Sequence, residues 1–390
     1  MKHTAVVLFF TVFFTVYGLV NFYIFSRGWQ ALPPDSSLRV PYTILFLFLA
    51  LAFIGGRFLE RVWWSGVSEG LVWIGSFWLA AMVYFFLAAL LCDTLRLVHA
   101  IMPFFPRVLT DAYDQTKFRI LLGVTMLVVL ILAAGHITTH FPRTKELRLT
   151  VPKGAEGGGM TIVAASDIHL GTIIGRSALR SIVDRINDLH PDCILLPGDI
   201  VDEDLAPVIR DNLGETLRDL RARYGVYAVT GNHEYIGGAE AACRYLEEHG
   251  ITMLRDSWVR LPNGVLIAGR EDASRRQFSG KPRKPLPEIL AGIDTTAPLI
   301  LMDHQPFRLE EAVQNGVDLQ LSGHTHHGQL WPFNEITRAV YEVSRGYLRK
   351  GDTNIYVSCG VGTWGPPVRT VGRPEIVHVT LTFGGTKPER

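Results

Sequence analysis

Residues 160–169 read MTIVAASDIH, a short apolar run that ends in an aspartate and a histidine. The run from 160 to 165 has the length and composition of a buried β-strand. We therefore expect it to deliver Asp167 and His169 at its carboxyl end. Because residues two apart on an extended chain point to the same face, both side chains could meet one metal ion.

Four further motifs follow along the chain, and each supplies oxygen or imidazole ligands. They are Gly198-Asp199, Gly231-Asn232-His233-Glu234, Asp303-His304-Gln305-Pro306 and Gly323-His324-Thr325-His326. None contains cysteine, so the ligand set suits Mn, Fe, Zn or Mg at a hydrolytic site better than an iron–sulfur cluster or a thiolate zinc. Taken alone, His304 reads as a loop or core histidine, and Asp199 or Asn232 as a turn residue. The ordered series predicts a two-metal phosphoesterase site.

The second half of the chain alternates strand-like runs with helical patterns, which predicts an α/β fold. We expect helices at 177–189, 213–222 and 239–248, and strands at 146–151, 160–165, 193–196, 226–229, 265–268, 299–302, 319–321, 355–358 and 375–382. Open α/β sheets bind ligands at the carboxyl ends of their strands, where the candidate ligands fall. The last two strands suggest a second sheet packed on the first.

The first 140 residues have a different, strongly apolar composition. Apolar runs near 5–24, 42–58, 71–91 and 120–138 approach the roughly 20 residues that cross a bilayer core. No ionisable residue lies at their centres, so we expect an anchor rather than a pore. The sequence thus predicts a four-helix transmembrane region at 1–143 and a catalytic domain at 144–390.

Charge and cysteine content bear on location and partners. Lysine and arginine are evenly divided between the two sides of the predicted spans, so the positive-inside rule does not choose an orientation. The four cysteines form no CxxC pair, which favours a reducing compartment. We expect an integral protein of the inner or cell membrane with its catalytic domain in the cytoplasm. A formal net charge of +1 argues against a nucleic-acid partner, and the oligomeric state stays open.

The motif set resembles that of the calcineurin-like metallophosphoesterase superfamily. It is more similar still to a membrane-anchored bacterial branch with a GHTHxGQ motif and a late GxGT…PEI segment, here Gly360-Val361-Gly362-Thr363 and Pro374-Glu375-Ile376. The resemblance covers roughly residues 146–382. It implies two mixed sheets packed as an α+β sandwich and flanked by helices. It also implies two divalent metal ions about 3.5–4 Å apart.

The resemblance implies a ligand set for each ion. One ion would take Asp167, His169 and His326. The other would take Asn232, His304 and His324. Asp199 would bridge both ions, since a carboxylate has two oxygens. We expect Mn, with Fe, Zn or Mg as alternatives.

The resemblance also implies how the reaction runs. A hydroxide bridging the two ions would attack phosphorus. His233 would donate a proton to the leaving oxygen or stabilise charge on the phosphoryl group, and Glu234 would orient His233. His327 departs from the family, which usually has glycine there. Its side chain would narrow the pocket or donate to phosphate, and Arg369 is a second candidate for substrate binding, with a surface salt bridge as the alternative.

These features together predict a membrane-embedded, metal-dependent phosphohydrolase. It would cleave a phosphodiester or pyrophosphate bond, with a lipid or lipid-linked nucleotide sugar as substrate, because the spans bring the site to the bilayer surface. Two alternatives stay open: a hydrolase of soluble phosphoesters that the spans only tether, and a catalytically silent membrane sensor or scaffold. Loss of ligand residues would mark the silent protein, and all seven are present here.

Overall fold

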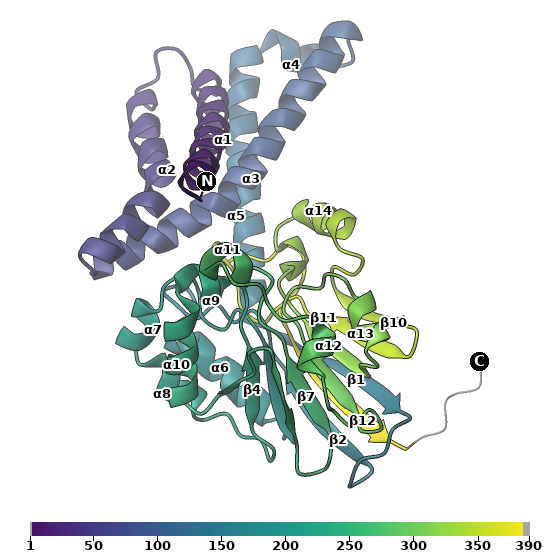
Figure 1. Cartoon of the computed structure of the whole chain (residues 1–390). Helices are drawn as coiled ribbons and strands as arrows, with labels where there is room; N and C mark the ends of the chain where they lie inside the picture. The colour runs from purple at the N-terminus through teal and green to yellow at the C-terminus, as the bar shows by residue number, and fades with distance from the viewer. Residues whose placement is uncertain (1, 385–390) are drawn as a thin grey trace. The chain divides into compact units, whose positions relative to one another are not determined.

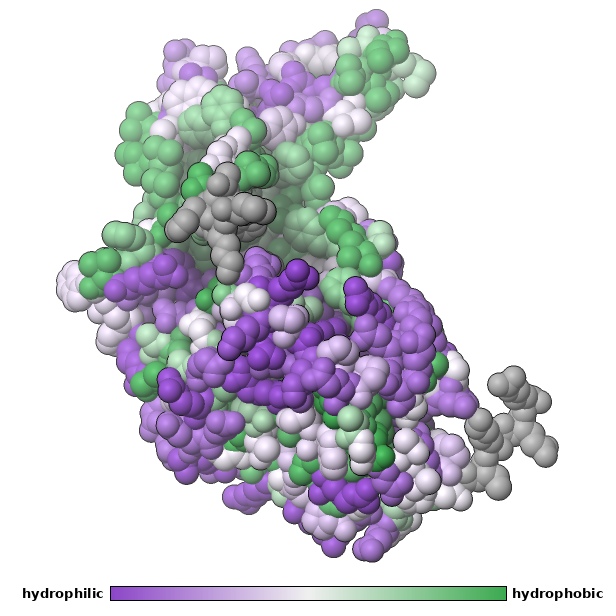
Figure 2. Space-filling view, in the orientation of Figure 1, coloured by the Kyte–Doolittle hydropathy of each residue, from purple (hydrophilic) through white to green (hydrophobic). Residues whose placement is uncertain are grey.

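The protein falls into two compact units, Met1–Gly135 and His136–Arg390, in a computed structural model that describes residues 2–384. The first unit contains helices α1 (Lys2–Ala31), α2 (Arg39–Val62), α3 (Gly66–Ile101), α4 (Arg107–Asp111) and α5 (Tyr113–Thr139) (Figure 1). Four of these helices are long and apolar enough to span a membrane, and they contain the four apolar runs expected from the sequence. Hydrophobic residues gather over their surface (Figure 2).

Two polar side chains of the first unit, Tyr17 and Trp78, find partners between its helices. The Tyr17 hydroxyl donates to the Ala50 carbonyl at 2.6 Å, and the Trp78 indole donates to Asn21 Oδ1 at 3.0 Å. A polar group left unpaired in an apolar surrounding is costly, so these bonds help to fix how α1 packs on α2 and α3. A Cβ on Gly75 would lie only 2.1 Å from the Phe53 nitrogen, so glycine there lets α2 and α3 approach closely.

The second unit contains two mixed six-stranded sheets. The first has the order β1-β12-β2-β3-β4-β5 and the second β10-β11-β9-β8-β7-β6. In the first sheet β12 runs parallel to β1 and antiparallel to β2, and β2 to β5 are parallel. The strands of the first sheet are β1 (Arg143–Val151), β2 (Gly159–Ala164), β3 (Cys193–Pro197), β4 (Val226–Val229), β5 (Thr252–Met253) and β12 (Glu375–Phe383). Those of the second are β6 (Ser257–Arg260), β7 (Leu266–Gly269), β8 (Leu299–Met302), β9 (Leu319–Ser322), β10 (Gly346–Lys350) and β11 (Thr353–Val357).

Strand alternation builds the layers of this unit. Ile162 and Leu195 of the first sheet are buried in one cluster with Ile300 of the second, so the two sheets pack face to face. Their neighbours Val163 and Leu196 point the other way and are buried among the helices. Helices α6 (Arg176–Asn187), α8 (Leu213–Leu217) and α10 (Ala239–Glu248) cover the first sheet, and α12 (Leu286–Ile289) and α13 (Glu310–Gln314) cover the second (Figure 1). The predicted fold class, two mixed sheets flanked by helices, is confirmed.

Several elements differ from the sequence expectation. The last predicted strand, β12, does not join the second sheet but lies between β1 and β2 of the first. The helix expected at 213–222 ends at Leu217, and β5, β6 and β10 were not anticipated. Strand β10 is only half-buried and contains Arg349 and Lys350, so it lacks an apolar run. The remaining helices are short: α7 (Ala206–Arg210), α9 (Asn232–Gly237), α11 (Arg275–Ser279), α14 (Phe333–Val340) and the 3₁₀ turn η1 (His326–Gly328).

Candidate metal centre

The predicted ligands meet where strands of both sheets end. In the first sheet Asp167 and His169 follow β2, Asp199 follows β3, and Asn232 begins α9 after β4. In the second sheet His304 follows β8, and His324 and His326 follow β9. Strands β2, β3 and β4 are parallel neighbours, as are β8 and β9. Their carboxyl ends therefore share one edge, which brings together residues spread over some 160 positions of sequence.

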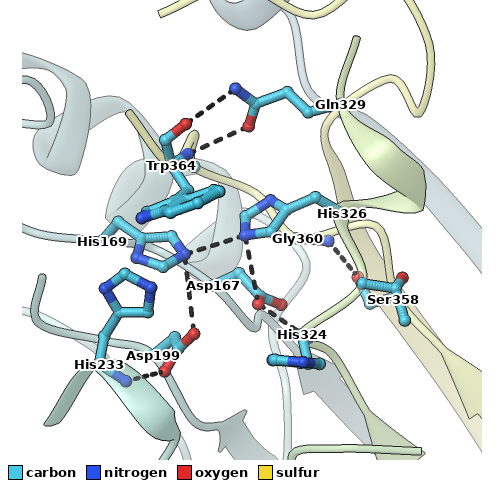
Figure 3. Close-up of polar contacts among 12 residues, drawn as sticks. Asp167, His169, Asp199, His233, His324, His326, Gln329, Ser358, Gly360 and Trp364 are labelled. Atoms are coloured by element: carbon cyan, nitrogen blue, oxygen red, sulfur yellow. Dashed lines mark hydrogen bonds and ion pairs between the residues drawn. The ribbon is translucent and has the colours of Figure 1, made fainter. Parts of the chain in front are cut away.

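Asp167, His169 and His326 form the first ligand group, with one ligand atom of each within 4.8 Å of the others (Figure 3). The Nε2 atoms of the two histidines lie 2.9 Å apart, and His326 Nε2 lies 3.5 Å from Asp167 Oδ1. All three side chains are buried. The group matches the first predicted ligand set.

Asp199, His304 and His324 form the second group, again with ligand atoms within 4.8 Å of one another. His304 Nε2 lies 3.1 Å from Asp199 Oδ2. The Asn232 carbonyl oxygen lies 2.7 Å from His324 Nδ1 and 3.2 Å from His304 Nε2, so the amide belongs to the same cluster. The second predicted set is likewise brought together.

One oxygen of Asp199 faces both groups. Its Oδ2 lies 3.1 Å from His304 Nε2 in the second group and 3.9 Å from His169 Nε2 in the first. The other oxygen, Oδ1, accepts the backbone N–H of His233 at 2.9 Å. This hydrogen bond fixes the carboxylate between the two groups, in the position that a bridging ligand would need.

The donor set fits a pair of divalent cations. Within the part of the chain that the structure describes, the buried Asp167 Oδ2 has no hydrogen-bond partner, as expected of an oxygen that serves a cation. Burial and the charge of His304 lower the pKa of His324 to about 4, and burial and Arg369 lower the pKa of His326. Neutral imidazoles keep a lone pair for metal binding. His304 Nδ1 lies 2.8 Å from the Pro197 carbonyl, which leaves Nε2 for the metal side.

The ligand residues lie on strained backbone rather than on extended chain. Left-handed φ angles occur at Asp167 (54°), His169 (55°), Asp199 (52°), His324 (70°) and His326 (45°). Such angles are uncommon outside glycine and cost on the order of 1–3 kcal/mol each. The expectation that Asp167 and His169 project from an extended strand is therefore wrong, because both residues have left-handed backbone after β2 has ended. His324 and His326 are also two residues apart, but they do not share a ligand group as side chains on one face of an extended chain would.

Glu234 holds this strained backbone in place. Its buried carboxylate accepts four backbone N–H groups, those of Gly231 (2.7 Å), Asp199 (3.1 Å), Ile200 (2.7 Å) and Val201 (2.9 Å). These bonds connect the loop after β3 to the loop after β4. The sequence expectation that Glu234 orients His233 is wrong, because its oxygens are directed at the main chain.

Asp202 takes the role that we had expected of Glu234. Its Oδ1 lies 2.9 Å from His233 Nδ1 and 3.7 Å from His169 Nδ1. Burial opposes a charge on His233, but the hydrogen bond to Asp202 and the charge of Asp199 outweigh it and raise the pKa of His233 to about 9. Sequence analysis missed Asp202, although a carboxylate three residues after Asp199 was a visible signal.

His327 lies beside the ligand loop but in none of the ligand groups among the described residues. Its ring is buried, with Nδ1 3.0 Å from the Ser344 hydroxyl, and burial lowers its pKa to about 4. Its φ of 48° explains why glycine suits this position. The contact with Ser344 occupies one ring nitrogen and favours a packing role over phosphate binding.

Arg369 is 1% exposed, and its guanidinium binds groups of the protein. It donates to the carbonyls of Gly362 (2.6 Å) and Gly372 (2.6 Å), and its Nη2 lies 2.9 Å from His326 Nδ1. These contacts argue against both the substrate-binding role and the surface salt bridge considered from the sequence. Arg369 instead fixes the ring of a ligand histidine.

Gln329 connects the two late sequence motifs. Its side-chain amide donates to the carbonyls of Trp364 and Pro366, each at 2.9 Å, and its oxygen accepts the Trp364 N–H at 3.1 Å (Figure 3). The Trp364 ring lies 5.8 Å from that of His233 and is 52% exposed. The last residue of GHTHxGQ thus holds the GxGT loop beside the metal centre.

Comparison with known proteins agrees with this geometry. Residues 160–328, which include all seven predicted ligands, match the family model of the calcineurin-like phosphoesterases. A metallophosphoesterase of Aquifex aeolicus is 34% identical over 261 residues, 66% of this chain and 99% of that protein. One of Caenorhabditis elegans is 31% identical over 366 residues, 88% of this chain and 74% of the relative. A transmembrane protein with a metallophosphoesterase domain from Danio rerio is 33% identical over 256 residues, 62% of this chain and 57% of that protein.

Proposed function

This chain belongs to the calcineurin-like metallophosphoesterases and is a metal-dependent phosphoesterase, and from that premise we propose that it cleaves a phosphodiester or pyrophosphate bond of a lipid or lipid-linked nucleotide sugar. We propose two divalent ions, with Mn as the expected metal. The four apolar helices support a membrane location. We propose the inner or cell membrane, a cytoplasmic catalytic domain, and a domain boundary at 143/144.

The ligand groups support the assignment of one ion to Asp167, His169 and His326, and of the other to Asn232, His304 and His324, with Asp199 shared. When bound, the two ions would supply a bridging hydroxide nucleophile and neutralise charge on the phosphoryl group. The protein contributes a buried, pre-arranged ligand cage. The ligand residues already have their left-handed backbone in the folded protein, so their main chain would need little rearrangement when metal binds.

His233 is proposed as the proton donor to the leaving oxygen. Its Nδ1 is 2.9 Å from Asp202 Oδ1, which leaves Nε2 as the ring nitrogen available to substrate. Asp202 stabilises the protonated imidazole and fixes the ring. His233 would either protonate the leaving oxygen or stabilise the phosphoryl charge.

The observation that carries the lipid proposal is the outward apolar face of α14. Phe333, Ile336 and Val340, at helical spacing, are 40%, 59% and 57% exposed, whereas the polar Asn334 is buried on the protein side. The charged Glu335 and Arg338 of the same helix are exposed as well, but three large apolar side chains on one outward face are unusual for a surface helix. An outward apolar face suits insertion into the edge of a bilayer.

Helix α14 also lies next to the ligand loop. A Cβ on Gly328, two residues after His326, would lie 2.4 Å from the Asn334 nitrogen, so the helix packs directly on η1. Trp364 is 52% exposed and its ring lies 5.8 Å from that of His233, and Trp331, just before α14, is 51% exposed. A lipid headgroup at the metal centre would therefore have apolar side chains beside it to receive its tails.

The test uses the full chain in mixed micelles with Mn²⁺ and a total membrane lipid extract, followed by ³¹P NMR. We expect a phosphorus signal to disappear with wild type and to persist with Asp199→Asn. An unchanged spectrum, together with continued cleavage of bis(4-nitrophenyl) phosphate, would reject the lipid substrate and make the spans a tether for a hydrolase of soluble phosphoesters. Failure to cleave any ester in spite of bound metal would favour the silent scaffold.

A further inference from the structure

The N-terminal unit contains a large cavity between its helices. Its volume is about 1180 Å³, above the range of about 300–1,000 Å³ that is usual for small-molecule sites. Residues from α1, α2, α3 and α5 line it, and its walls are mostly apolar, with Ile24, Phe46, Trp78, Phe85 and Val124 among them. A space of this size and character suits hydrocarbon chains.

Cationic side chains gather in the same cavity. Arg27, Arg39, Arg96 and Lys117 all line it, whereas Asp93 is its one lining carboxylate among the described residues. Asp93 Oδ2 accepts Arg27 Nε at 2.8 Å, and Oδ1 lies 3.5 Å from Arg96. One carboxylate cannot neutralise this set, even though Lys117 is paired with Asp114 outside the lining. The cavity is therefore cationic, which favours an anionic occupant.

The Arg39 guanidinium has a hydrogen-bond donor that lacks an acceptor. Its Nε is buried without a hydrogen-bond partner among the residues that the structure describes. Its guanidinium lies 4.9 Å from the centre of the Trp29 ring, and its Nη2 reaches the Leu32 carbonyl only at 3.3 Å. A buried donor without an acceptor is costly, and a phosphate oxygen would satisfy it with a charge-assisted bond.

The cationic residues share one end of the helix bundle. Arg27 and Arg96 lie near the ends of α1 and α3, and Arg39 and Lys117 near the starts of α2 and α5. Thr139, from which the chain continues to β1, is at the other end of α5. In a membrane-spanning bundle the cationic end therefore belongs to the leaflet opposite the one at which the chain leaves α5.

We propose that this cavity is a resident site for an anionic phospholipid, with its acyl chains along the apolar walls and its phosphate at Arg39, Arg27 and Arg96. The lipid is separate from the substrate, because its headgroup lies at the end of the bundle away from Thr139. The lipid would fill the cavity and neutralise the charge of its cationic lining. The proposal stands whether or not the catalytic substrate is a lipid.

The test is lipid binding by the full chain in mild detergent. Native mass spectrometry would count bound phosphatidylglycerol and phosphatidylcholine offered at equal concentration, for wild type, an Arg39→Gln/Arg96→Gln double variant and an Arg61→Gln control. Arg61 lies in the last turn of α2 and does not line the cavity. We expect wild type and the control to retain phosphatidylglycerol at least tenfold more tightly than phosphatidylcholine, and the double variant to lose that preference.

The helical circular dichroism signal and the elution volume in detergent report folding of each variant, and Arg39→Gln alone replaces the double variant if the latter is unfolded. Three results would overturn the proposal: equal retention of the two lipids by wild type, an undiminished preference in the folded variants, or a mass showing two chains and no lipid. None of these results bears on hydrolysis at the metal centre, which the ³¹P experiment tests separately.

Discussion

Gln329 and Trp364 exchange two hydrogen bonds, Gln329 Nε2 to the Trp364 carbonyl at 2.9 Å and the Trp364 N–H to Gln329 Oε1 at 3.1 Å. A side-chain amide that pairs with both main-chain groups of one residue makes the same two hydrogen bonds as an opposite residue of an antiparallel strand. It fixes a loop that has no regular secondary structure. The exposed indole of Trp364 is thereby kept beside His233, the proposed proton donor.

Gln329→Ala should free the Trp364 loop without touching a metal ligand. We expect kcat/KM for bis(4-nitrophenyl) phosphate to fall about tenfold, equivalent to about 1.4 kcal/mol, with metal content unchanged by elemental analysis. Gln314→Ala, at an exposed position on α13, is the control. Unaltered kinetics in the Gln329 variant would mean that the loop does not position substrate.

Asp202→Asn should impair proton donation by His233. The hydrogen bond to Asp202 and the charge of Asp199 raise the pKa of His233 to about 9, so removal of the Asp202 carboxylate lowers that pKa. A general acid works only below its pKa, and the basic limb of the pH–rate profile should therefore move to lower pH, with kcat reduced about 10²-fold. A pH series of kcat at saturating metal measures both effects. A uniform loss of rate with an unmoved limb would contradict the role of Asp202.

Glu234→Gln should destabilise the catalytic unit. The buried carboxylate accepts four backbone N–H groups, and an amide puts its own N–H₂ against some of them. We expect a loss of roughly 2–4 kcal/mol in the free energy of unfolding, measured by urea denaturation. Glu247→Gln, exposed near the end of α10, should cost little. Equal stability of the two variants would show that the hydrogen bonds of the Glu234 carboxylate contribute nothing to the free energy of unfolding.

Removal of metal should abolish hydrolysis and lower the melting temperature. Cations that bind only the folded protein stabilise it by about 2.7 kcal/mol at a hundredfold excess over Kd. Dialysis against EDTA followed by titration with Mn²⁺ should restore both properties in wild type. Asp199→Asn should recover neither in full, because it loses the shared ligand. A metal-free protein with the original melting temperature would contradict the proposed centre.

Ile336→Asp should separate lipid from soluble substrates. A charge on the outward apolar face of α14 opposes insertion into a bilayer edge, whereas the metal groups are untouched. We expect slower loss of the lipid phosphorus signal in mixed micelles, by about tenfold, and an unchanged rate on bis(4-nitrophenyl) phosphate. Arg338→Gln on the same helix also changes the charge by one negative unit and is the matched control. Equal slowing on both substrates would show that α14 has no specific role in lipid recognition.

The sequence predicted the strands that consist of apolar residues. Strands such as β4 and β8 are apolar throughout and are flanked by turn residues, so their limits coincide with the expected ones. Strand β10 could not be recognised, because its stability comes from pairing with β11 rather than from its own side chains. The position of β12 depends on pairing between residues more than 200 apart, which no local pattern encodes.

The residues of the candidate site also differ in whether the sequence could predict them. The ligand residues could be recognised because metal chemistry restricts their types, and their order repeats that of a known motif series. The partners of those residues could not. The roles of Asp202, Glu234 and Arg369 depend on where each side chain points, which is set by left-handed turns after the strands. An adjacent position in the sequence made Glu234 seem the partner of His233, whereas the turn selects Asp202.

The place of β12 has a consequence for biosynthesis. Strand β1 follows directly from the last membrane helix, yet its register partner within the first sheet is β12, from Arg143 opposite Glu375 to Val151 opposite Phe383. The ribosome therefore releases β1 long before the strand that attaches it to β2 exists. Until then β1 has no partner strand. The first sheet is completed last, at the strand that follows the last apolar helix in sequence, so a nascent chain stalled before residue 375 would have all four apolar helices but an incomplete sheet.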